Sequence, residues 1–551
     1  MTDIPTRPQP YLITLNPDHV SPLSRRGITL ATIAEELDRA SDRQSVGSGD
    51  SPAAPRVRRL GVRGQDPHTL AVTLDSRGIS ALKSQYGDAL LIEPDIELDL
   101  FDSGPASGLQ RVAPGNFFAL GTSKLVLSIT VTDPDGAAVP LAEVRADGTA
   151  PFSSDKDVTN ARGRAEVTLY GETPTSLRAL QVKPSSGFWG RLVKRPDLSG
   201  VSKRNGKYHL TLTVTPILSE GHDETDIWGY RAMALHNAND EEHEGRAPVR
   251  IAIIDSGIAP THETLSPAGG EDFTDRDDPE AWREDLSGHG THVAGTCGAD
   301  FNGRGICGAA GPGAGMHGLS VFPGGRTSSI IAALDWCIDK QIDVANMSLG
   351  GPTPTKALED AVARAAAAGV FMVAAAGNSA GPVMYPAAFE KVVAVAAIGE
   401  TDSFPSDSPH ANHRGAHQSG RFFSAEFTCF GPEIDVAAPG VAVISTVPSE
   451  DDAGYAAWDG TSMASPYVAG FAARLLSARP SLRDMARGAE RVAALRDALF
   501  DTCTDLGLPR DVQGRGMPIW PAAAPSPGGD DTATILDRLK RISKELEREI
   551  G

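Results

Sequence analysis

Three segments of the chain carry the side chains that covalent hydrolysis of an amide requires. Asp255 follows the apolar run of residues 251–254, His289 lies in GHGTHVAG, and Ser462 lies in GTSMASP. A serine nucleophile needs a base that removes its proton, and the base needs a third group that holds it in place. These residues therefore predict hydrolysis in which an aspartate orients a histidine and the histidine activates a serine.

The neighbouring residues predict how these side chains are positioned. A continuous apolar run indicates a strand buried on both faces, so Asp255 should emerge at the carboxyl edge of a sheet, where α/β sites form. Small residues on both sides of His289 should let a helix begin close to that strand. Ser462 should begin an apolar helix over residues 463–476, with Pro466 near its first turn. A helix N-terminus favours nearby negative charge, which suits an oxyanion.

From about residue 223 to residue 523, predicted strands and helices alternate. Residues 251–254 and 370–375 are apolar runs typical of buried strands, and residues 357–368 have a helical pattern. The alternation predicts an α/β domain built on a doubly wound, mostly parallel sheet.

Two smaller units precede this domain. Residues 1–103 predict an α+β unit, with strands at 10–20, 70–74 and 90–100 and helices at 28–40 and 79–86. Residues 117–217 predict an all-β sandwich, because short alternating segments at 124–131, 165–170, 177–182 and 208–214 are separated by turn residues. The end of the chain, residues 531–551, predicts a charged amphipathic helix with one apolar stripe.

The three chemical segments are similar to the signature motifs of the subtilisin-like serine proteases, in the family order Asp, His, Ser. Further segments resemble the same family: IWGY at 227–230, NMSLGG at 346–351, AAGN at 375–378, YPA at 385–387 and DVAAPG at 435–440. The resemblance covers about residues 223–523.

The resemblance implies a role for each of the matched residues. Asp255 would orient His289, which would act first as general base and then as general acid, while Ser462 attacks the scissile carbonyl. The side chain of Asn378 and the backbone N–H of Ser462 would hold the oxyanion. No cofactor is expected for this chemistry.

The resemblance also implies a substrate cleft. Substrate should add as a strand to this cleft, lined by Ser348, Leu349, Gly350, Ala375, Ala376, Gly377 and Met384. Met384 stands where the family often has a small residue near the primary specificity pocket. One hypothesis is that Met384 shortens the pocket and favours small or medium apolar side chains; the alternative is that this adaptable side chain bends aside.

Metal binding has weaker support in the sequence. The family commonly binds structural calcium, and the candidate oxygen ligands are Asp272, Asp275, Asp277, Asp278 and the NGRG turn at 302–305. The polar stretch 402–431 is longer than is usual in the family and contains His410, His413 and His417. We expect a solvated surface loop there, with a metal site as the alternative.

Residues 10–98 resemble the inhibitor-like propeptide of subtilases, through YLITL at 11–15, the helix that follows, and IEPD at 92–95. The resemblance implies an intramolecular partner that blocks the cleft, and we expect its tail, about residues 97–107, to enter the active site and be cut there. Residues 117–217 resemble bacterial immunoglobulin-like modules, which serve as spacers or bind partners. The C-terminal helix should dock on this protein or on another helix, because so short a helix is marginal alone.

Charge and composition bear on partners and location. The net charge of −20 argues against nucleic acid and anionic lipid as partners, since both require many cationic groups. The five cysteines are scattered, which favours free thiols. The first residues lack the pattern of a signal peptide and no stretch is apolar enough to span a membrane, so we expect a cytoplasmic protein, with leaderless export as an open alternative.

The sequence thus predicts a serine endopeptidase made as a self-inhibited, self-processing precursor. Two alternatives remain open. One is a protease of narrow specificity that a partner releases; the other is an inactive protein that keeps the fold for binding. A substitution in the triad would favour the inactive protein, but all three residues are present.

Overall fold

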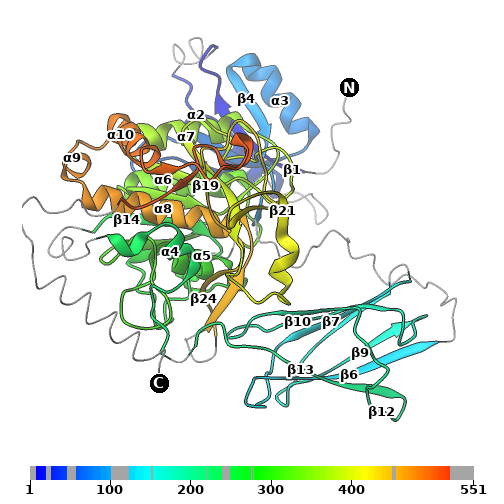
Figure 1. The fold of residues 1–551 in the computed structure, drawn as a ribbon. Helices are drawn as coiled ribbons and strands as arrows, with labels where there is room; N and C mark the ends of the chain where they lie inside the picture. Colours follow the sequence, from blue (N-terminus) through cyan, green and yellow to red (C-terminus); the bar gives the residue numbers. More distant parts are fainter. Residues whose placement is uncertain are drawn as a thin grey trace, which may run out of the picture.

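The computed structural model describes residues 8–19, 27–45, 57–100, 123–150, 153–219, 221–238, 248–274, 276, 278–449 and 454–521. Figure 1 shows a large α/β domain, a small α+β unit that lies against it, and a β-sandwich at its side. The predicted C-terminal helix at 531–551 lies outside the described residues.

A mostly parallel sheet forms the centre of the α/β domain. Its strand order is β15-β16-β14-β17-β19-β20-β22-β21, and β23 also pairs with β20. The pairs from β15 to β20 and the β20–β23 pair are parallel, whereas β22 and β21 add in antiparallel orientation. The predicted fold class is confirmed. The strands are β14 (Arg250–Asp255), β15 (Gly269–Asp272), β16 (Gly315–Ser320), β17 (Val344–Met347), β19 (Phe371–Ala375), β20 (Val392–Glu400), β21 (Arg414–Ser419), β22 (Phe422–Ala425) and β23 (Val436–Pro439).

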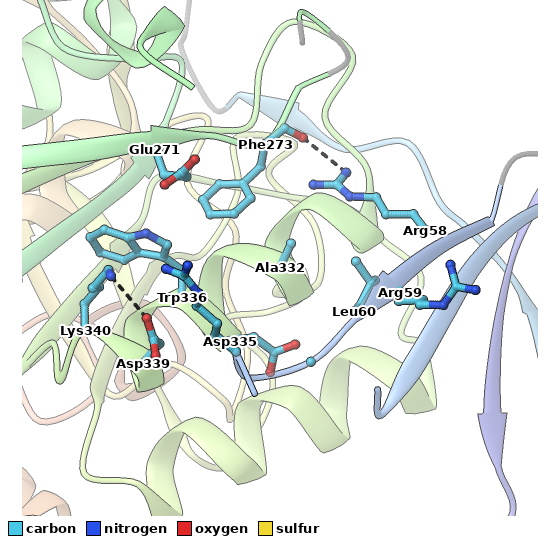
Figure 2. A pocket seen from close by; sticks show the side chains of 12 residues that line it. Arg58, Arg59, Leu60, Glu271, Phe273, Ala332, Asp335, Trp336, Asp339 and Lys340 are labelled. Carbon is cyan, nitrogen blue, oxygen red and sulfur yellow. Dashed lines mark hydrogen bonds and ion pairs between the residues drawn. The ribbon is translucent and has the colours of Figure 1, made fainter. Parts of the chain in front are cut away.

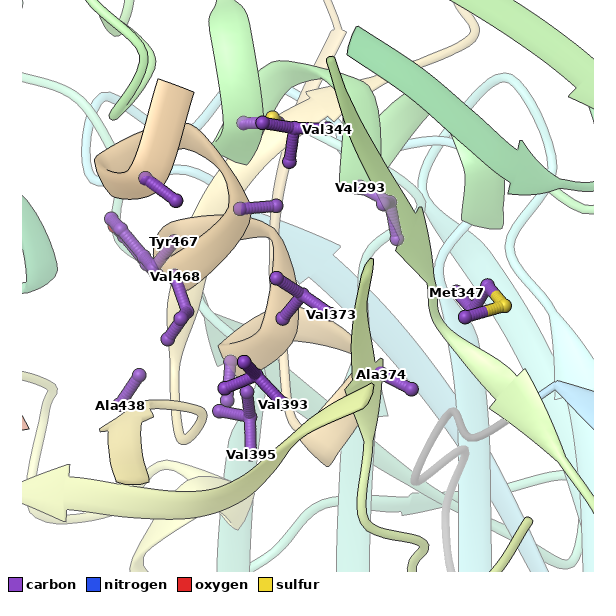
Figure 3. Close-up of a cluster of buried hydrophobic side chains, with 14 of the residues drawn as sticks. Val293, Val344, Met347, Val373, Ala374, Val393, Val395, Ala438, Tyr467 and Val468 are labelled. Atoms are coloured by element: carbon purple, nitrogen blue, oxygen red, sulfur yellow. The ribbon is translucent and has the colours of Figure 1, made fainter. Parts of the chain in front are cut away.

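Five longer helices pack around this sheet: α5 (His289–Gly298), α6 (Thr327–Asp339), α7 (Lys356–Ala367), α8 (Thr461–Ala478) and α10 (Ala489–Phe500). Helix α8 is apolar on all sides and is buried along almost its whole length, as expected for a helix inside a domain. It packs against α5 and against β17, β19, β20 and β23. Figure 3 shows Tyr467 and Val468 of α8 among Val373 of β19 and Val393 of β20.

Short elements complete the α/β domain. They are α4 (Trp228–Ala232), α9 (Pro480–Arg483), α11 (Arg510–Gln513), the two-residue strand β18 (Leu349–Gly350), the pair β24 (Val443–Val447) and β25 (Gly454–Trp458), and the pair β26 (Cys503–Thr504) and β27 (Met517–Pro518). Single turns of 3-10 helix occur at Leu235–Asn237, Ala281–Arg283 and Pro409–His413.

The N-terminal unit is an antiparallel sheet of order β2-β3-β1-β4 covered by two helices. Its elements are β1 (Gln9–Leu15), α2 (Leu30–Ser45), β2 (Val57–Leu60), β3 (Thr69–Leu74), α3 (Ser76–Tyr86) and β4 (Leu90–Pro94). Edge strand β2 was not predicted, because its sequence VRRL has no clear alternation. The predicted strand 90–100 is instead two strands, since Pro94 ends β4 and a separate strand β5 (Asp99–Leu100) follows.

Residues 124–213 form two four-stranded sheets, of orders β11-β10-β7-β8 and β12-β13-β6-β9, around a core of their own. The strands are β6 (Lys124–Thr132), β7 (Glu143–Gly148), β8 (Ser154–Val158), β9 (Arg164–Tyr170), β10 (Leu177–Lys183), β11 (Arg191–Lys194), β12 (Lys203–Arg204) and β13 (Lys207–Thr213). Sequence alternation indicated β6, β9, β10 and β13. It missed short or polar strands such as β8, SDKDV, which are mainly exposed and so carry no apolar period.

Candidate active site

Asp255 and His289 meet at the carboxyl edge of the sheet. Asp255 is the last residue of β14, and His289 is the first residue of α5. The His289 Nδ1 atom lies 2.7 Å from Asp255 Oδ1, and both side chains are buried. A β-carbon on Gly290 would lie 2.1 Å from the carbonyl oxygen of Gly257, so only glycine lets α5 start this close to the strand. The predicted reason for the small residues around His289 is confirmed.

A second carboxylate, Asp285, fixes the loop that leads to His289. Its Oδ1 atom accepts from Ser256 Oγ at 2.8 Å and from the Gly288 N–H at 2.9 Å. Its Oδ2 atom accepts from the backbone N–H and the hydroxyl of Thr291, both at 2.7 Å. Sequence analysis missed this residue, although an acidic residue shortly before a helix start is a signal for capping.

Ser462 is the second residue of α8, and Pro466 explains how its carbonyl is satisfied. Pro466 was expected near the first turn, where a missing N–H costs little, but it is the sixth residue of the helix. In an α-helix the residue four positions on donates to a carbonyl, and Pro466 has no N–H to give to Ser462. The hydroxyl of Ser348 donates to that carbonyl instead, at 2.9 Å. The Ser462 hydroxyl in turn donates to the carbonyl oxygen of Ser348, also at 2.9 Å.

Asn378 lies beside the same helix start. Its Oδ1 atom accepts from the Thr461 N–H at 3.0 Å and from the Thr461 hydroxyl at 2.8 Å. Because the oxygen of the amide is engaged in this way, its Nδ2 group is the one that can donate to a substrate oxygen. Asp255 and His289 thus lie together at the start of α5, Asn378 lies at the start of α8 beside Ser462, and α5 packs against α8.

The predicted cleft strand is occupied by the chain itself. Leu349 and Gly350 of β18 pair antiparallel with Leu100 and Asp99 of β5. On the other side, the Leu98 N–H donates to the Gly325 carbonyl at 3.0 Å, and the Thr327 N–H donates to the Ile96 carbonyl at 3.0 Å. The segment 96–100 thus lies between two backbone stretches of the α/β domain, as an added strand does. Residues 101–107 of the predicted tail lie outside the described part of the chain.

Met384 packs against the segment 375–377, which was predicted to line the substrate cleft. The Met384 N–H donates to the carbonyl of Ala376 at 2.9 Å. A β-carbon on Gly377 would lie 3.0 Å from Met384 Sδ and 2.9 Å from the sulfur of Cys429. The side chains of Met384 and Cys429 therefore both lie against Gly377.

His292, one turn after His289 on α5, is a packed residue. It stacks on Trp458 with ring centroids 4.8 Å apart, and its Nε2 atom is 3.1 Å from the Val443 carbonyl oxygen. Burial lowers the pKa of His292 to about 3. The imidazole is therefore neutral at ordinary pH and cannot serve as a second catalytic cation.

Of the candidate calcium ligands, Asp272 is held by protein side chains. Asp272 accepts from Arg276 Nη2 at 2.7 Å and from the Thr274 hydroxyl at 2.6 Å, so an arginine takes the place that a cation would have. Asp275 and Asp277 lie outside the described residues. Over the part of the chain that the structure describes, no three His, Cys, Asp or Glu side chains come together as metal ligands. Subtilases need no cofactor for catalysis.

The histidines of the polar stretch 402–431 have three different environments. His417 is exposed, as a solvated loop predicts, but His410 is only 6% exposed. The His410 Nδ1 atom lies 2.7 Å from Asp459 Oδ1, and His413 Nε2 lies 3.5 Å from Asp459 Oδ2. The expectation of a solvated loop is therefore wrong for His410, because a buried carboxylate and aromatic neighbours cover it.

A cavity of about 290 Å³ lies away from these residues, between the N-terminal unit and the α/β domain. Figure 2 shows Arg58 and Leu60 of β2 on one side and Phe273, Trp336 and Asp339 on the other. Arg58 Nη1 donates to the carbonyl of Phe273 across this junction, at 3.4 Å. The cavity is thus part of the contact between the two units, and none of the four site residues lines it.

The fold and these contacts define an α/β domain with a buried Asp–His pair at the start of α5 and a serine at the start of α8, the helix against which α5 packs. Comparison with known proteins agrees: residues 246–517 match the model of the subtilase family. The chain is 38% identical to Subtilisin DY of Bacillus licheniformis over 269 residues. This alignment covers 47% of this chain and 85% of the subtilisin. The chain is 37% identical to Subtilisin Savinase of Lederbergia lenta over 294 residues, 53% of this chain and 95% of the relative. The chain belongs to the subtilase family, and it is a serine-type endopeptidase that acts on proteins or peptides.

The comparisons also correct one prediction. The relatives are secreted extracellular subtilisins, and this contradicts the cytoplasmic location expected from the first residues. Within the described residues, no helix is long and apolar enough to cross a membrane.

Proposed function

We propose that Asp255, His289 and Ser462 form the catalytic triad of this endopeptidase. His289 accepts the proton of the Ser462 hydroxyl as its oxygen attacks the scissile carbonyl, and then gives that proton to the leaving amine. Asp255 holds the imidazole in the tautomer with Nδ1–H and stabilises the imidazolium. Water then hydrolyses the acyl-enzyme by the same steps in reverse order. The buried 2.7 Å contact between Asp255 and His289 carries this assignment, because His289 begins a helix that packs against α8.

The oxyanion of each tetrahedral intermediate is held by Asn378 Nδ2 and the Ser462 N–H in this proposal. Thr461 orients the Asn378 amide through two hydrogen bonds to Oδ1 before substrate arrives. Donors that are fixed in advance stabilise the developing charge without reorganisation at the moment of reaction. Leu349 and Gly350 bind the substrate backbone, while Gly377 and Met384 limit the side chain that enters the pocket.

We further propose that the N-terminal unit is a propeptide that inhibits the protease and is removed by it. The pairing of Asp99 and Leu100 with Gly350 and Leu349 supports this, because the unit fills the cleft in the manner of a substrate strand. Because the pairing is antiparallel, the strand that ends at Leu100 runs toward Ser348, whose hydroxyl donates to the carbonyl of Ser462. We therefore expect the scissile bond within a few residues after Leu100.

Two acidic side chains of the unit cap helices of the α/β domain. The Glu93 carboxylate accepts the N–H groups of Lys356 and Ala357, at 2.8 and 3.0 Å, at the start of α7. Asp95 accepts the N–H of Ser328 at 2.9 Å at the start of α6. Helix N-termini have unsatisfied donors and a positive dipole end, so these contacts direct the unit to one docking position.

The test compares the purified wild type with Ser462→Ala by intact mass over time. We expect the wild type to lose an N-terminal fragment that ends shortly after Leu100, and Ser462→Ala to stay whole. Labelling with a serine-reactive fluorophosphonate should follow the same pattern. If the wild type stays whole, and if it also stays unlabelled once the N-terminal unit has been removed chemically at an engineered cleavage site, the triad is contradicted. A labelled wild type without the cut contradicts only the self-processing.

A further inference from the structure

The polar stretch between β20 and β23 places His410 against a buried carboxylate close to the nucleophile. His410 belongs to the 3-10 turn Pro409–His413, and its Nδ1 atom lies 2.7 Å from both carboxylate oxygens of Asp459. The two side chains are 6% and 7% exposed. A buried hydrogen-bonded pair of this kind holds its geometry, because breaking it leaves a polar group without water or partner.

Asp459 stands at the turn that leads from β25 into α8, three residues before Ser462. Its Oδ1 atom also accepts from the Ala442 N–H at 2.8 Å. The following N–H, that of Gly460, donates to the Gly440 carbonyl at 2.8 Å. The position of the nucleophile therefore depends on this short turn, and Asp459 is the side chain that attaches the turn to the polar stretch.

The β-sandwich contacts both sides of this arrangement, as its position in Figure 1 allows. The Trp189 ring meets His410 edge to face, with centroids 5.8 Å apart. The Leu192 N–H donates to the Asp407 carbonyl at 2.6 Å, and the Gly187 N–H donates to the Tyr455 carbonyl of β25 at 2.7 Å. Two side-chain contacts add to these: Arg191 with Asp407 at 3.0 Å, and Lys194 with Asn412 at 2.9 Å.

We propose that the β-sandwich is a positioning element of the active site: residues 187–194 hold His410 against Asp459, and this contact sets the position of Ser462. His410 and Asp459 are positioning residues in this proposal, because they act through the turn that leads to Ser462. The inference rests on the proposed role of Ser462 as nucleophile. A cut shortly after Leu100 precedes the sandwich, so processing leaves the sandwich attached to the α/β domain that it supports.

The test uses the full chain after self-processing, with kcat expressed per active site titrated by a fluorophosphonate. His410→Phe keeps a ring and removes the donor to Asp459, whereas His410→Asn keeps a donor near the position of Nδ1. We expect His410→Phe to lower kcat about tenfold with little change in KM, because a small displacement of a reacting group is costly. His410→Asn should recover most of that loss. His417→Phe, on an exposed histidine of the same stretch, is the matched control and should leave kcat unchanged.

The contribution of the sandwich is measured with Trp189→Ala, alone and combined with His410→Phe. Alone, Trp189→Ala should lower kcat severalfold; in the His410→Phe background it should have little further effect, because both changes break one contact path. If circular dichroism shows that His410→Phe does not fold, the kcat of Trp189→Ala is compared with that of His417→Phe, and this comparison tests the proposal. The proposal is overturned if titrated Trp189→Ala and His410→Phe both match the wild type in kcat, or if KM changes while kcat does not. Failure of the wild type itself to react with the fluorophosphonate would instead overturn the proposed triad.

Discussion

Glu93 offers a direct measurement of how the N-terminal unit is held. Helix α7 already has a side-chain cap, since Thr355 accepts from the Leu358 N–H. The remaining donors at its start, the N–H groups of Lys356 and Ala357, are taken by Glu93 of the N-terminal unit. Glu93→Ala should therefore weaken docking and leave the α/β domain itself unchanged.

The size of the effect follows from capping and dipole contributions. Losing a capping side chain at a helix N-terminus costs about 1–2 kcal/mol when the charge is also removed. Each 1.4 kcal/mol is a factor of ten in a dissociation constant, so we expect docking to weaken about 5- to 30-fold.

The assay follows peptide hydrolysis by the self-processed complex at a series of enzyme concentrations. Dilution releases the cleaved unit and restores activity, and the concentration at half-release gives the dissociation constant. Asp88→Asn is the matched control, because Asp88 is an exposed carboxylate of the same unit. The capping contact is refuted if Glu93→Ala and this control have half-release concentrations within about twofold of each other, because loss of the cap should change that concentration by more.

Three further results are expected. Asn378→Leu should lower kcat and leave KM nearly unchanged; loss of the corresponding asparagine in subtilisin costs about 10²–10³-fold, a size we adopt from that enzyme. Met384→Ala should raise kcat/KM for peptides with Phe before the scissile bond relative to Ala, by about tenfold or more, since a methylene-sized change in a pocket is worth about 10–200-fold. In the Ser462→Ala background, Asp459→Asn should reduce the free energy of unfolding at neutral pH, and this reduction should shrink as the pH falls. Burial by itself would raise the pKa of Asp459, but His410 and His413 hold that pKa below its ordinary value. A depressed carboxylate pKa stabilises the fold above the unfolded-state pKa, and that stabilisation is lost as pH falls through the folded-state value.

Each of these three predictions is contradicted by a specific outcome. Thr461→Val, which removes only the hydroxyl that holds the Asn378 amide, should cost less than Asn378→Leu; an equal loss means that orientation and not the amide donor is what matters. A wild-type preference for Phe over Ala and Leu would show that Met384 bends aside. A difference between Asp459→Asn and its parent that stays constant from neutral pH down to strongly acid pH, in denaturant unfolding, would contradict the linkage.

Local sequence determined the parts of the site that lie on single elements. The apolar run that ends in Asp255 and the helix that carries Ser462 each follow from neighbouring residues, because the burial of an element sets the pattern of its own residues. The small residues around His289 predicted a close approach, and the structure shows that Gly257 is the partner of Gly290. The mostly parallel sheet follows for the same reason, since strands buried on both faces are apolar throughout. The roles of Asn378 and of the cleft strand were predicted from the resemblance to the subtilases.

Only the tertiary structure decided which distant residues serve one another. The Ser348 hydroxyl replaces the donor that Pro466 lacks, Glu93 caps a helix that begins more than 260 residues later, and Trp189 reaches His410 beside Asp459. No periodicity encodes such contacts, because each depends on how separately folded elements come together in space. His410 shows this most clearly: its sequence surroundings are polar and predict a solvated loop, and it is buried because the sandwich and the turn before Ser462 cover it.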